Sequence, residues 1–532
     1  MTDVLLPLSI AVPIVAATLP LAFGLWYDDV GWPVAAVTTL GVVGSAVAVA
    51  LEVYTAGPFD HELGGFAPPI GIELVADELS AAVFLLVALV SAATLVLSRA
   101  VGPRGNAFHS AYLLLTGGLV GVSLTGDLFN LFVFLEIVGL TTYALIAADR
   151  SGASAYASLK YLVVGTVGAS LYLVGVGYVF LATGTLNMAD VSIQIVEQAS
   201  HTDPLVRAGY AFIVAGFALK IALFPVHSWQ PDAYQRAPDA VTTVVAALVS
   251  TASAYALIRV SYSVFTVDFL TANDAITTGI LVVSGVSIVA GSLLAVMQSD
   301  LKRMFAYSSV AQFGMIAAAV GMADETALLG GIVHLIGHGL LKFGLFFGLA
   351  LLAAGYGARR VDDLSSLARR APFATGALAV LGLALVGIPP SIGFLGKWYI
   401  ALGAVRSAGA GGGTAGIWIA VVILVSTLFT LAYVARVIER LYFAGVDPEN
   451  AAGGVSGGPV DPVAGPDRDA GETVSDGEAV ADGGNGDAAA PGTVPTAPLA
   501  VLVAVTLVAV GLGFAGAGFE TLLDPYLSEV FA

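Results

Sequence analysis

Apolar runs of about 20 residues recur along the whole chain, and they constrain the fold more than any other feature. A helix needs about 20 such residues to cross the roughly 30 Å hydrocarbon core of a bilayer. Of the 532 residues, 58% are hydrophobic and only 11% are charged, whereas a soluble domain carries about 25% charged residues. The sequence therefore predicts an all-α integral membrane protein. The first run, residues 4–25, lacks a positively charged leader, so we interpret it as a membrane helix rather than a signal peptide.

The hydrophobic pattern predicts about fourteen transmembrane helices. We place them at residues 4–25, 33–54, 78–98, 109–125, 128–148, 157–183, 206–227, 239–264, 275–298, 303–322, 326–355, 373–400, 415–442 and 497–517. The segments between them carry Gly, Pro and charge, as loops do. Residues 445–496 are rich in Gly, Ala, Pro and Asp and hold few large apolar side chains, which predicts a disordered loop.

Basic residues gather in the loops on one side of this expected topology. Fourteen of the twenty lie there: Arg99, Arg104, Arg150, Lys160, Arg236, Lys302, Arg303, Arg359, Arg360, Arg369, Arg370, Arg436, Arg440 and Arg468. The loops on the other side hold only Arg207, Arg259 and Arg406. Because cytoplasmic loops are enriched in Lys and Arg, we expect the first set to be cytoplasmic and both termini to face outward.

The remaining composition excludes several classes of function. The net charge is −18, and residues 445–496 contribute ten acidic side chains against one arginine. This acidity is typical of a halophilic protein and equally of a simple acidic loop. Without a basic patch, nucleic-acid binding is not expected. Without cysteine, the chain has no disulfide, thiolate metal site or iron–sulfur cluster of its own, and no nucleotide or cofactor motif is visible.

Two opposite charges fall inside expected membrane helices. Glu136 lies about nine residues into helix 5 and Lys220 about fourteen into helix 7. Both helices start from the same side, so at 1.5 Å per residue the two depths differ by about 8 Å or less. A charge at this depth costs at least roughly 2.5–3.5 kcal/mol, which an ion pair would offset. The pair is either a static clamp between helices or a switchable pair that lets Lys220 take up and release protons.

A second polar series lies in helix 11. His334, His338 and Lys342 follow a spacing of four residues, so they share one face of the helix over roughly 12 Å of depth. Histidine titrates near neutral pH and passes protons through either ring nitrogen, so the series indicates part of a proton relay. Two alternatives are a structural hydrogen-bonding stripe and a zinc site, although no Glu lies between the histidines as a HExxH motif requires.

Two expected helices combine a buried lysine with proline. Lys397 in helix 12 follows Pro389 and Pro390, and Pro225 in helix 7 follows Lys220. Proline lacks an N–H donor and clashes with the preceding turn, so both helices are predicted to be broken. Irregular backbone inside a membrane is tolerated only where protein or a polar cavity satisfies it. Paired broken helices suggest repeated halves with an ion site in each, whereas the simpler alternative is a pair of kinks.

These residues lie in segments that resemble a known family. The segments are TGDLFNLFVFLEIVGLTTYALIA, FALKIALFPVHSWQPDAYQRAP, DLKRMFAYSSVAQFGMI, HLIGHGLLKFGLFF and LVGIPPSIGFLGKWYI. Together they resemble the proton-translocating subunits of Mrp antiporters, membrane-bound hydrogenases and respiratory complex I, over roughly residues 4–440. The segment GIELVADELSAAVFLLVALV looks most similar to the D-type subunit of the Mrp complex.

The resemblance implies two inverted five-helix repeats, helices 4–8 and 9–13, each with a half-channel. The chain would divide into 1–108, the repeats 109–264 and 265–442, an acidic cytoplasmic loop 443–496, and a last helix in 497–532. By motif match, Glu136 and Lys220 take the ion-pair positions, His334, His338 and Lys342 the central relay, and Lys397 the terminal lysine position.

One position departs from the family pattern. Relatives of the Mrp D type usually carry a lysine in helix 8, in a motif similar to LLxKVGVYALxR, whereas this chain has ALVSTASAYALIR with Thr251 at that place. A hydroxyl joins a water chain but cannot store a proton as a cation at neutral pH. Either waters bridge Lys220 to helix 11, or transfer between the halves is weaker.

We therefore expect a subunit of a multi-subunit Na⁺/H⁺ antiporter in the cell membrane, with other membrane subunits, protons and sodium as partners. It would be a secondary transporter rather than an enzyme. The alternatives are the proton-pumping arm of a redox complex, such as complex I or a hydrogenase, and a silent scaffold of the same fold.

Overall fold

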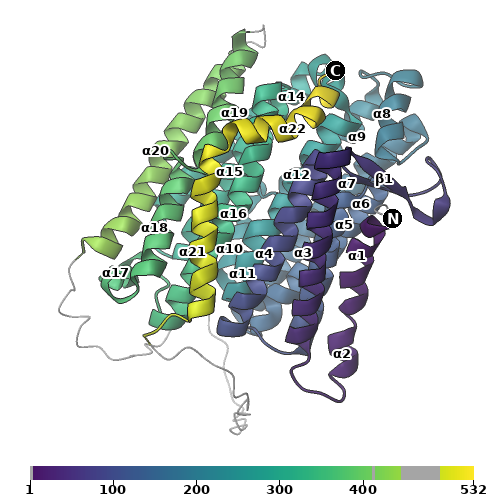
Figure 1. Ribbon diagram of the computed structural model, residues 1–532. Coiled ribbons are helices and arrows are strands. Elements are labelled where there is room, and N and C mark those ends of the chain that lie inside the picture. Colours follow the sequence, from purple (N-terminus) through teal and green to yellow (C-terminus); the bar gives the residue numbers. More distant parts are fainter. Residues whose placement is uncertain (1–3, 410–413, 445–491) are drawn as a thin grey trace, which may run out of the picture.

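Twelve helices are long and apolar enough to cross a membrane in the computed structural model, which describes residues 4–409, 414–444 and 492–532 (Figure 1). Ten of them are α1 with α2 (Leu5–Ala16, Leu19–Phe23), α3 (Gly31–Ala56), α4 (Glu78–Val101), α5 (Asn106–Leu124), α6 (Leu128–Ile146), α7 (Gly152–Thr183), α14 (Asp274–Val296), α15 (Leu301–Gly321), α16 (Glu325–Tyr356) and α20 (Ala415–Tyr442). The other two are α21 (Thr496–Gly511) and a continuous run of α11 (Asp239–Val244), a π-turn (Val245–Val249), α12 (Ser250–Arg259) and a second π-turn (Val260–Val264). Most of the acidic loop expected at 445–496 lies outside the described residues.

The two remaining expected crossings are broken helices, as the sequence predicts. Helix 7 consists of α9 (Pro204–Lys220) and α10 (Trp229–Arg236), with Pro225 in the gap between them. Helix 12 consists of α18 (Pro372–Val386) and α19 (Ile392–Gly409), and its gap holds Pro389 and Pro390. Together with the twelve continuous spans, these two account for the fourteen expected crossings.

The two ends of the helix bundle differ in what they carry. At one end, here named the hairpin end, strands β1 (Phe59–Glu62) and β2 (Glu73–Ala76) form an antiparallel hairpin in which Phe59 pairs with Ala76. The short helices α8 (Met188–Glu197), α13 (Thr266–Ala272) and α22 (Gly516–Val530) connect or follow crossings at the same end. The opposite end, here named the basic end, holds the arginine-rich loops and α17 (Leu367–Arg370).

Two series of five crossings follow one another along the chain. The first runs from α5 to α12 and the second from α14 to α20. Each contains a helix of 32 residues, α7 or α16, that directly precedes the broken crossing of its series. The exact boundaries at 109–264 and 265–442 stay predictions.

The helices that carry polar residues form the centre of the bundle. In their most apolar windows, the 239–264 run and α15 are 100% buried and α16 is 89% buried. In contrast, α3 and α20 are 33% buried and α21 is 22% buried, and they expose large side chains such as Leu424 and Leu507. The outer helices therefore present apolar side chains to lipid, while polar groups on the central helices face protein.

Several boundaries expected from the sequence are wrong. Helix 7 was expected to end at residue 227, but α9 ends at Lys220 and α10 adds a second helical segment that ends at Arg236. The sequence of α10, WQPDAYQR, is polar enough to resemble a loop. The hairpin, α8 and α22 were also missed, because short strands and amphipathic helices at a membrane surface give no 20-residue apolar signal.

Candidate functional site

Glu136 and Lys220 form a direct ion pair between α6 and α9. The Lys220 Nζ atom lies 3.1 Å from Glu136 Oε1. The side chain of Lys220 is 9% exposed and that of Glu136 is 23% exposed. In a site of low polarity, each charge offsets the desolvation of the other. The ion pair that the sequence allowed is therefore present without an intervening water.

Lys220 is the last residue of α9, directly before the break in helix 7. The break leaves backbone groups that need partners. Neighbouring elements supply two of these contacts: the Phe224 N–H donates to the Ser287 hydroxyl at 3.2 Å, and the Trp229 indole donates to the Leu219 carbonyl at 3.0 Å. Protein groups thus hold the irregular segment that places Lys220 next to Glu136.

The three polar residues of α16 are buried, at 2% exposure for His334, 1% for His338 and 0% for Lys342. Lys342 Nζ donates to the Phe305 carbonyl at 2.6 Å and to the Ser308 hydroxyl, both on α15. His334 Nε2 lies 2.9 Å from Gln312 Oε1, which is also on α15. Neither ring nitrogen of His338 has a hydrogen-bond partner among the described residues. Buried polar atoms of this kind are where ordered waters bind.

Lys397 lies in α19, just past the break in helix 12. Its Nζ atom donates to the Leu385 carbonyl at 2.8 Å and to the Val386 carbonyl at 3.0 Å. These carbonyls end α18, where the helix dipole favours a cation. Gly396 brings α19 close to α16, since a Cβ atom there would lie only 2.6 Å from His334 Cβ. Lys397 is the residue after Gly396, so it lies next to the point where α19 approaches His334 of α16.

Thr251 lies on α12 between the two halves. It is 1% exposed, and its hydroxyl has no partner among the described residues. Its Cγ2 atom would lie 3.7 Å from a Cβ atom at Gly339, so Thr251 faces α16 at the residue that follows His338 in the sequence. The predicted site residues are thus brought together in one buried series that runs from α6 through α9, α12 and α16 to α19.

Sequence reasoning missed the partners of these residues. Ser308 and Gln312 hold Lys342 and His334, and their spacing of four residues on α15 was a usable signal. Arg259 was assigned to an outer loop, but it is 8% exposed and forms a bidentate ion pair with Asp77 at the start of α4. Burial alone would raise the pKa of Asp77, but Arg259 outweighs it and holds that pKa below its ordinary value.

Two further ion-pair groups lie at the basic end. Lys302 and Arg359 both pair with Asp239. Asp232 lies between Lys160, at 2.6 Å, and Arg303, at 2.7 Å. These pairs connect α10 and α11 of the first series to α15 of the second.

Replacing Asp232 with Asn is expected to have a small effect on stability. The substitution removes the negative charge that Lys160 and Arg303 share. All three side chains are about a quarter to a third exposed, so water and salt screen the attraction, and we expect a loss of about 1 kcal/mol or less. Thermal unfolding in detergent at low and high salt measures it, and a large, salt-independent loss would contradict it.

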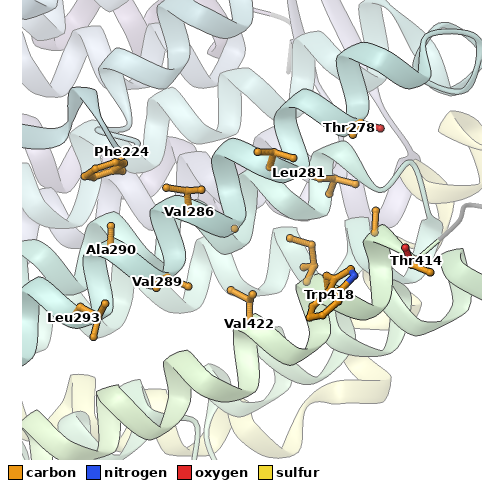
Figure 2. A pocket seen from close by; sticks show the side chains of 14 residues that line it. Phe224, Thr278, Leu281, Val286, Val289, Ala290, Leu293, Thr414, Trp418 and Val422 are labelled. Carbon is orange, nitrogen blue, oxygen red and sulfur yellow. The ribbon is translucent and has the colours of Figure 1, made fainter.

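One apolar pocket does not belong to this polar series. A cavity of about 700 Å³ lies between α14 and α20, with an apolar lining that includes Leu281, Val286, Val289, Trp418 and Val422 (Figure 2). It contains none of the predicted site residues. Within the described ranges, no group of three or more His, Cys, Asp or Glu side chains is arranged to hold a metal ion.

Comparisons with known proteins agree with this arrangement. Over 422 residues, the chain is 40% identical to NADH-quinone oxidoreductase subunit N of Desulforudis audaxviator, covering 77% of this chain and 81% of the relative. It is 31% identical over 368 residues to the D-type subunit of the Na⁺/H⁺ antiporter of Alkalihalophilus pseudofirmus, covering 69% and 73%.

Among solved structures, a chain of the Mrp complex from Dietzia sp. is 26% identical and superposes with a TM-score of 0.80, covering 100% of this chain and 99% of that one. A chain of the membrane-bound sulfane sulfur reductase, an archaeal respiratory membrane complex, gives a TM-score of 0.81 at 28% identity, covering 99% and 97%. Residues 125–430, which hold the whole buried polar series, match the family described as "NADH:quinone oxidoreductase/Mrp antiporter, TM". The chain belongs to this family and is an antiporter-like, multi-pass membrane subunit.

Proposed function

We propose that the chain is the proton-translocating subunit of a multi-subunit Na⁺/H⁺ antiporter. The observation that carries the proposal is the series of buried polar side chains on α6, α9, α12, α16 and α19, with contacts between successive helices at several of its members. Glu136 pairs with Lys220, Thr251 faces Gly339 of α16, and Lys397 follows Gly396, which contacts His334. Lysine amines and histidine rings carry protons along such a series.

The Glu136–Lys220 pair is the proposed switch. With the pair closed, the carboxylate keeps Lys220 protonated. When the two side chains separate, burial favours the neutral amine, and Lys220 gives its proton toward α16. Lys342 accepts it, His338 and His334 pass charge along α16, and Lys397 receives it in the second half. A proton gradient would drive the cycle, with sodium moved by the complex in the opposite direction.

A polar cavity supports access to the series from the basic end. It has a volume of about 500 Å³ and a lining that includes Asp149, Arg236, Asp239, Lys302 and Arg359. Lys302 lies on α15 about one turn from Phe305, whose carbonyl accepts from Lys342. The excess of Lys and Arg at this end is the reason to assign it to the cytoplasm, in a cell membrane with both termini outside.

Replacing Glu136 with Gln tests the proposed switch. The amide cannot hold Lys220 in its charged form, so we expect sodium-driven proton flux to fall by at least about tenfold. The loss should be smaller than the roughly 10²–10⁴-fold contributed by a group that transfers the proton itself, because Glu136 acts through Lys220. Flux is measured with a pH-sensitive dye in inverted vesicles that contain the whole complex. Glu52→Gln on α3 is the matched control and should transport normally. Unchanged flux in the Glu136 variant would contradict the proposal.

A specific observation also favours a second candidate, a proton-pumping arm of a redox complex. The relative at 40% identity is named NADH-quinone oxidoreductase subunit N. The chain would look nearly the same in either assembly, so the neighbouring subunits distinguish them. Mass spectrometry of the purified native complex should find only membrane subunits for an antiporter, and iron–sulfur or flavin proteins for a redox complex.

A further inference from the structure

Three neutral polar side chains form a buried cluster beside Lys220 that the relay described above does not use. Gln230 of α10 and Ser250 of α12 are 0% exposed, and Tyr234 of α10 is 1% exposed. The Gln230 side-chain nitrogen donates to the Tyr234 hydroxyl at 3.1 Å and to the Ser250 hydroxyl at 3.3 Å. We refer to Gln230, Tyr234 and Ser250 as the neutral cluster.

The neutral cluster is only partly satisfied by protein. The side-chain oxygen of Gln230 is buried and has no hydrogen-bond partner among the described residues. The hydroxyl of the adjacent Thr251 is also buried and has no hydrogen-bond partner among the described residues. A buried amide without partners costs about 1–3 kcal/mol on protein scales, so a sequence that needed only packing here is better served by an apolar side chain. The unpaired atoms give the cluster the capacity to bind water.

The neutral cluster contacts the backbone of Lys220 on one side and the helix that carries Lys342 on the other. On one side, the Ser250 hydroxyl donates to the carbonyl of Lys220 at 3.5 Å. On the other, the Tyr234 ring packs edge-on against Phe346 of α16, with ring centroids 5.8 Å apart, and Thr251 faces Gly339 of the same helix.

Lys342 lies between these two contacts on α16. Positions 339 and 346 are seven residues apart and therefore fall within about 20° of the same helix face. Lys342 comes between them and is turned by no more than about 60° from either. The two contacts on α16 thus lie one on each side of Lys342 along the helix.

A π-turn directly precedes the two hydroxyl residues of α12. The turn spans Val245–Val249, and Ser250 and Thr251 follow it. A π-turn shifts the register of side chains on a helix and occurs frequently at functional sites. Here the register lets Ser250 point toward helix 7 while Thr251 points toward α16, so one short segment reaches both halves.

We propose that Gln230, with Ser250 and Tyr234, positions the water molecules through which protons cross from Lys220 to Lys342. This inference rests on the proposed function and identifies Gln230 as its positioning residue. One N–H bond breaks at the Lys220 ammonium, protons shift along the waters, and one N–H bond forms at the Lys342 amine. The neutral cluster itself gains no charge, so no proton is stored between the two lysines.

Replacing Gln230 with Leu tests this proposal in the whole complex. The apolar side chain displaces the bound water, so we expect proton flux to fall at least about tenfold. Adding Thr251→Lys to the Gln230→Leu variant should restore much of the flux, because an amine then bridges the same gap. A purely structural role for Gln230 predicts no such rescue. Ser91→Ala, another buried polar change on α4, serves as the control and should leave flux unchanged.

The absence of cysteine in the sequence allows a second test that does not depend on transport. A single cysteine at Thr251 should react with silver ions in the folded complex, because water reaches the site, whereas a cysteine at Ala256 should not. Failure of the Thr251 cysteine to react, or full flux in the Gln230→Leu variant, overturns the inference. If Lys220→Ala also transports normally, the proposed function fails with it; if that variant is inactive, only the inference fails.

Discussion

Replacing Lys220 with Ala abolishes transport if the chain is a proton relay. The variant removes the amine that pairs with Glu136 at 3.1 Å, and no other ion pair among the described residues joins α6 to α9. We expect sodium-driven proton flux to fall by roughly 100-fold or more, to the background of empty vesicles, because the loss removes a positioned proton-transfer group. Reconstituted vesicles with the intact complex give the measurement.

Lys160→Ala provides the matched control for this change. Lys160 also pairs with a carboxylate, Asp232, but it is 27% exposed and lies at the basic end. Its loss should reduce flux little, since exposed ion pairs contribute at most about 1 kcal/mol. Equal flux in the Lys220 variant and the parent complex, with normal assembly, would identify the chain as a silent scaffold.

Replacing Asp77 with Asn has the largest expected effect on stability. Asp77 caps α4 and accepts two hydrogen bonds from Arg259, and both side chains are 10% exposed. The substitution leaves a buried guanidinium without its counter-ion, which costs about 3–5 kcal/mol. Thermal unfolding of the purified complex in detergent should show the loss as a clearly lower Tm.

The double variant Asp77→Leu with Arg259→Leu separates this cause from simple loss of packing. Removing both charges leaves nothing unpaired, so most of the stability should return. A double variant as unstable as the single one would contradict the explanation. Because Arg259 holds the pKa of Asp77 below its ordinary value, the contribution of the pair should stay constant at neutral pH and disappear only in acid, below about pH 4.

The sequence predicted the features that follow from membrane burial. Fourteen crossings came from apolar length, and the breaks in helices 7 and 12 came from Pro225, Pro389 and Pro390. The approach of Glu136 to Lys220 followed from depth alone, since both residues lie in helices that start from the same side. A rise of 1.5 Å per residue is reliable enough for such an estimate.

The contacts that depend on rotation and packing could not be predicted in the same way. Gln230 lies after Pro225 in a polar stretch that resembles a loop. Its side chain is buried because the chain forms a second helix, α10, after the break. The ion pair of Arg259 could not be predicted, because its partner, Asp77, is 182 positions away in the sequence. Hydropathy gives the depth of a residue but not the neighbour that it faces.

The three membrane lysines are held by unequal partners. Lys220 faces a full negative charge on Glu136, whereas Lys397 is bound by two main-chain oxygens at the end of α18 and has no carboxylate in contact within the described part of the chain. Under the proposed function, a proton that passes from Lys220 to Lys397 leaves a site stabilised by a full negative charge for one stabilised only by main-chain dipoles. In that relay, the separation of Glu136 from Lys220 is the step that requires a supply of energy.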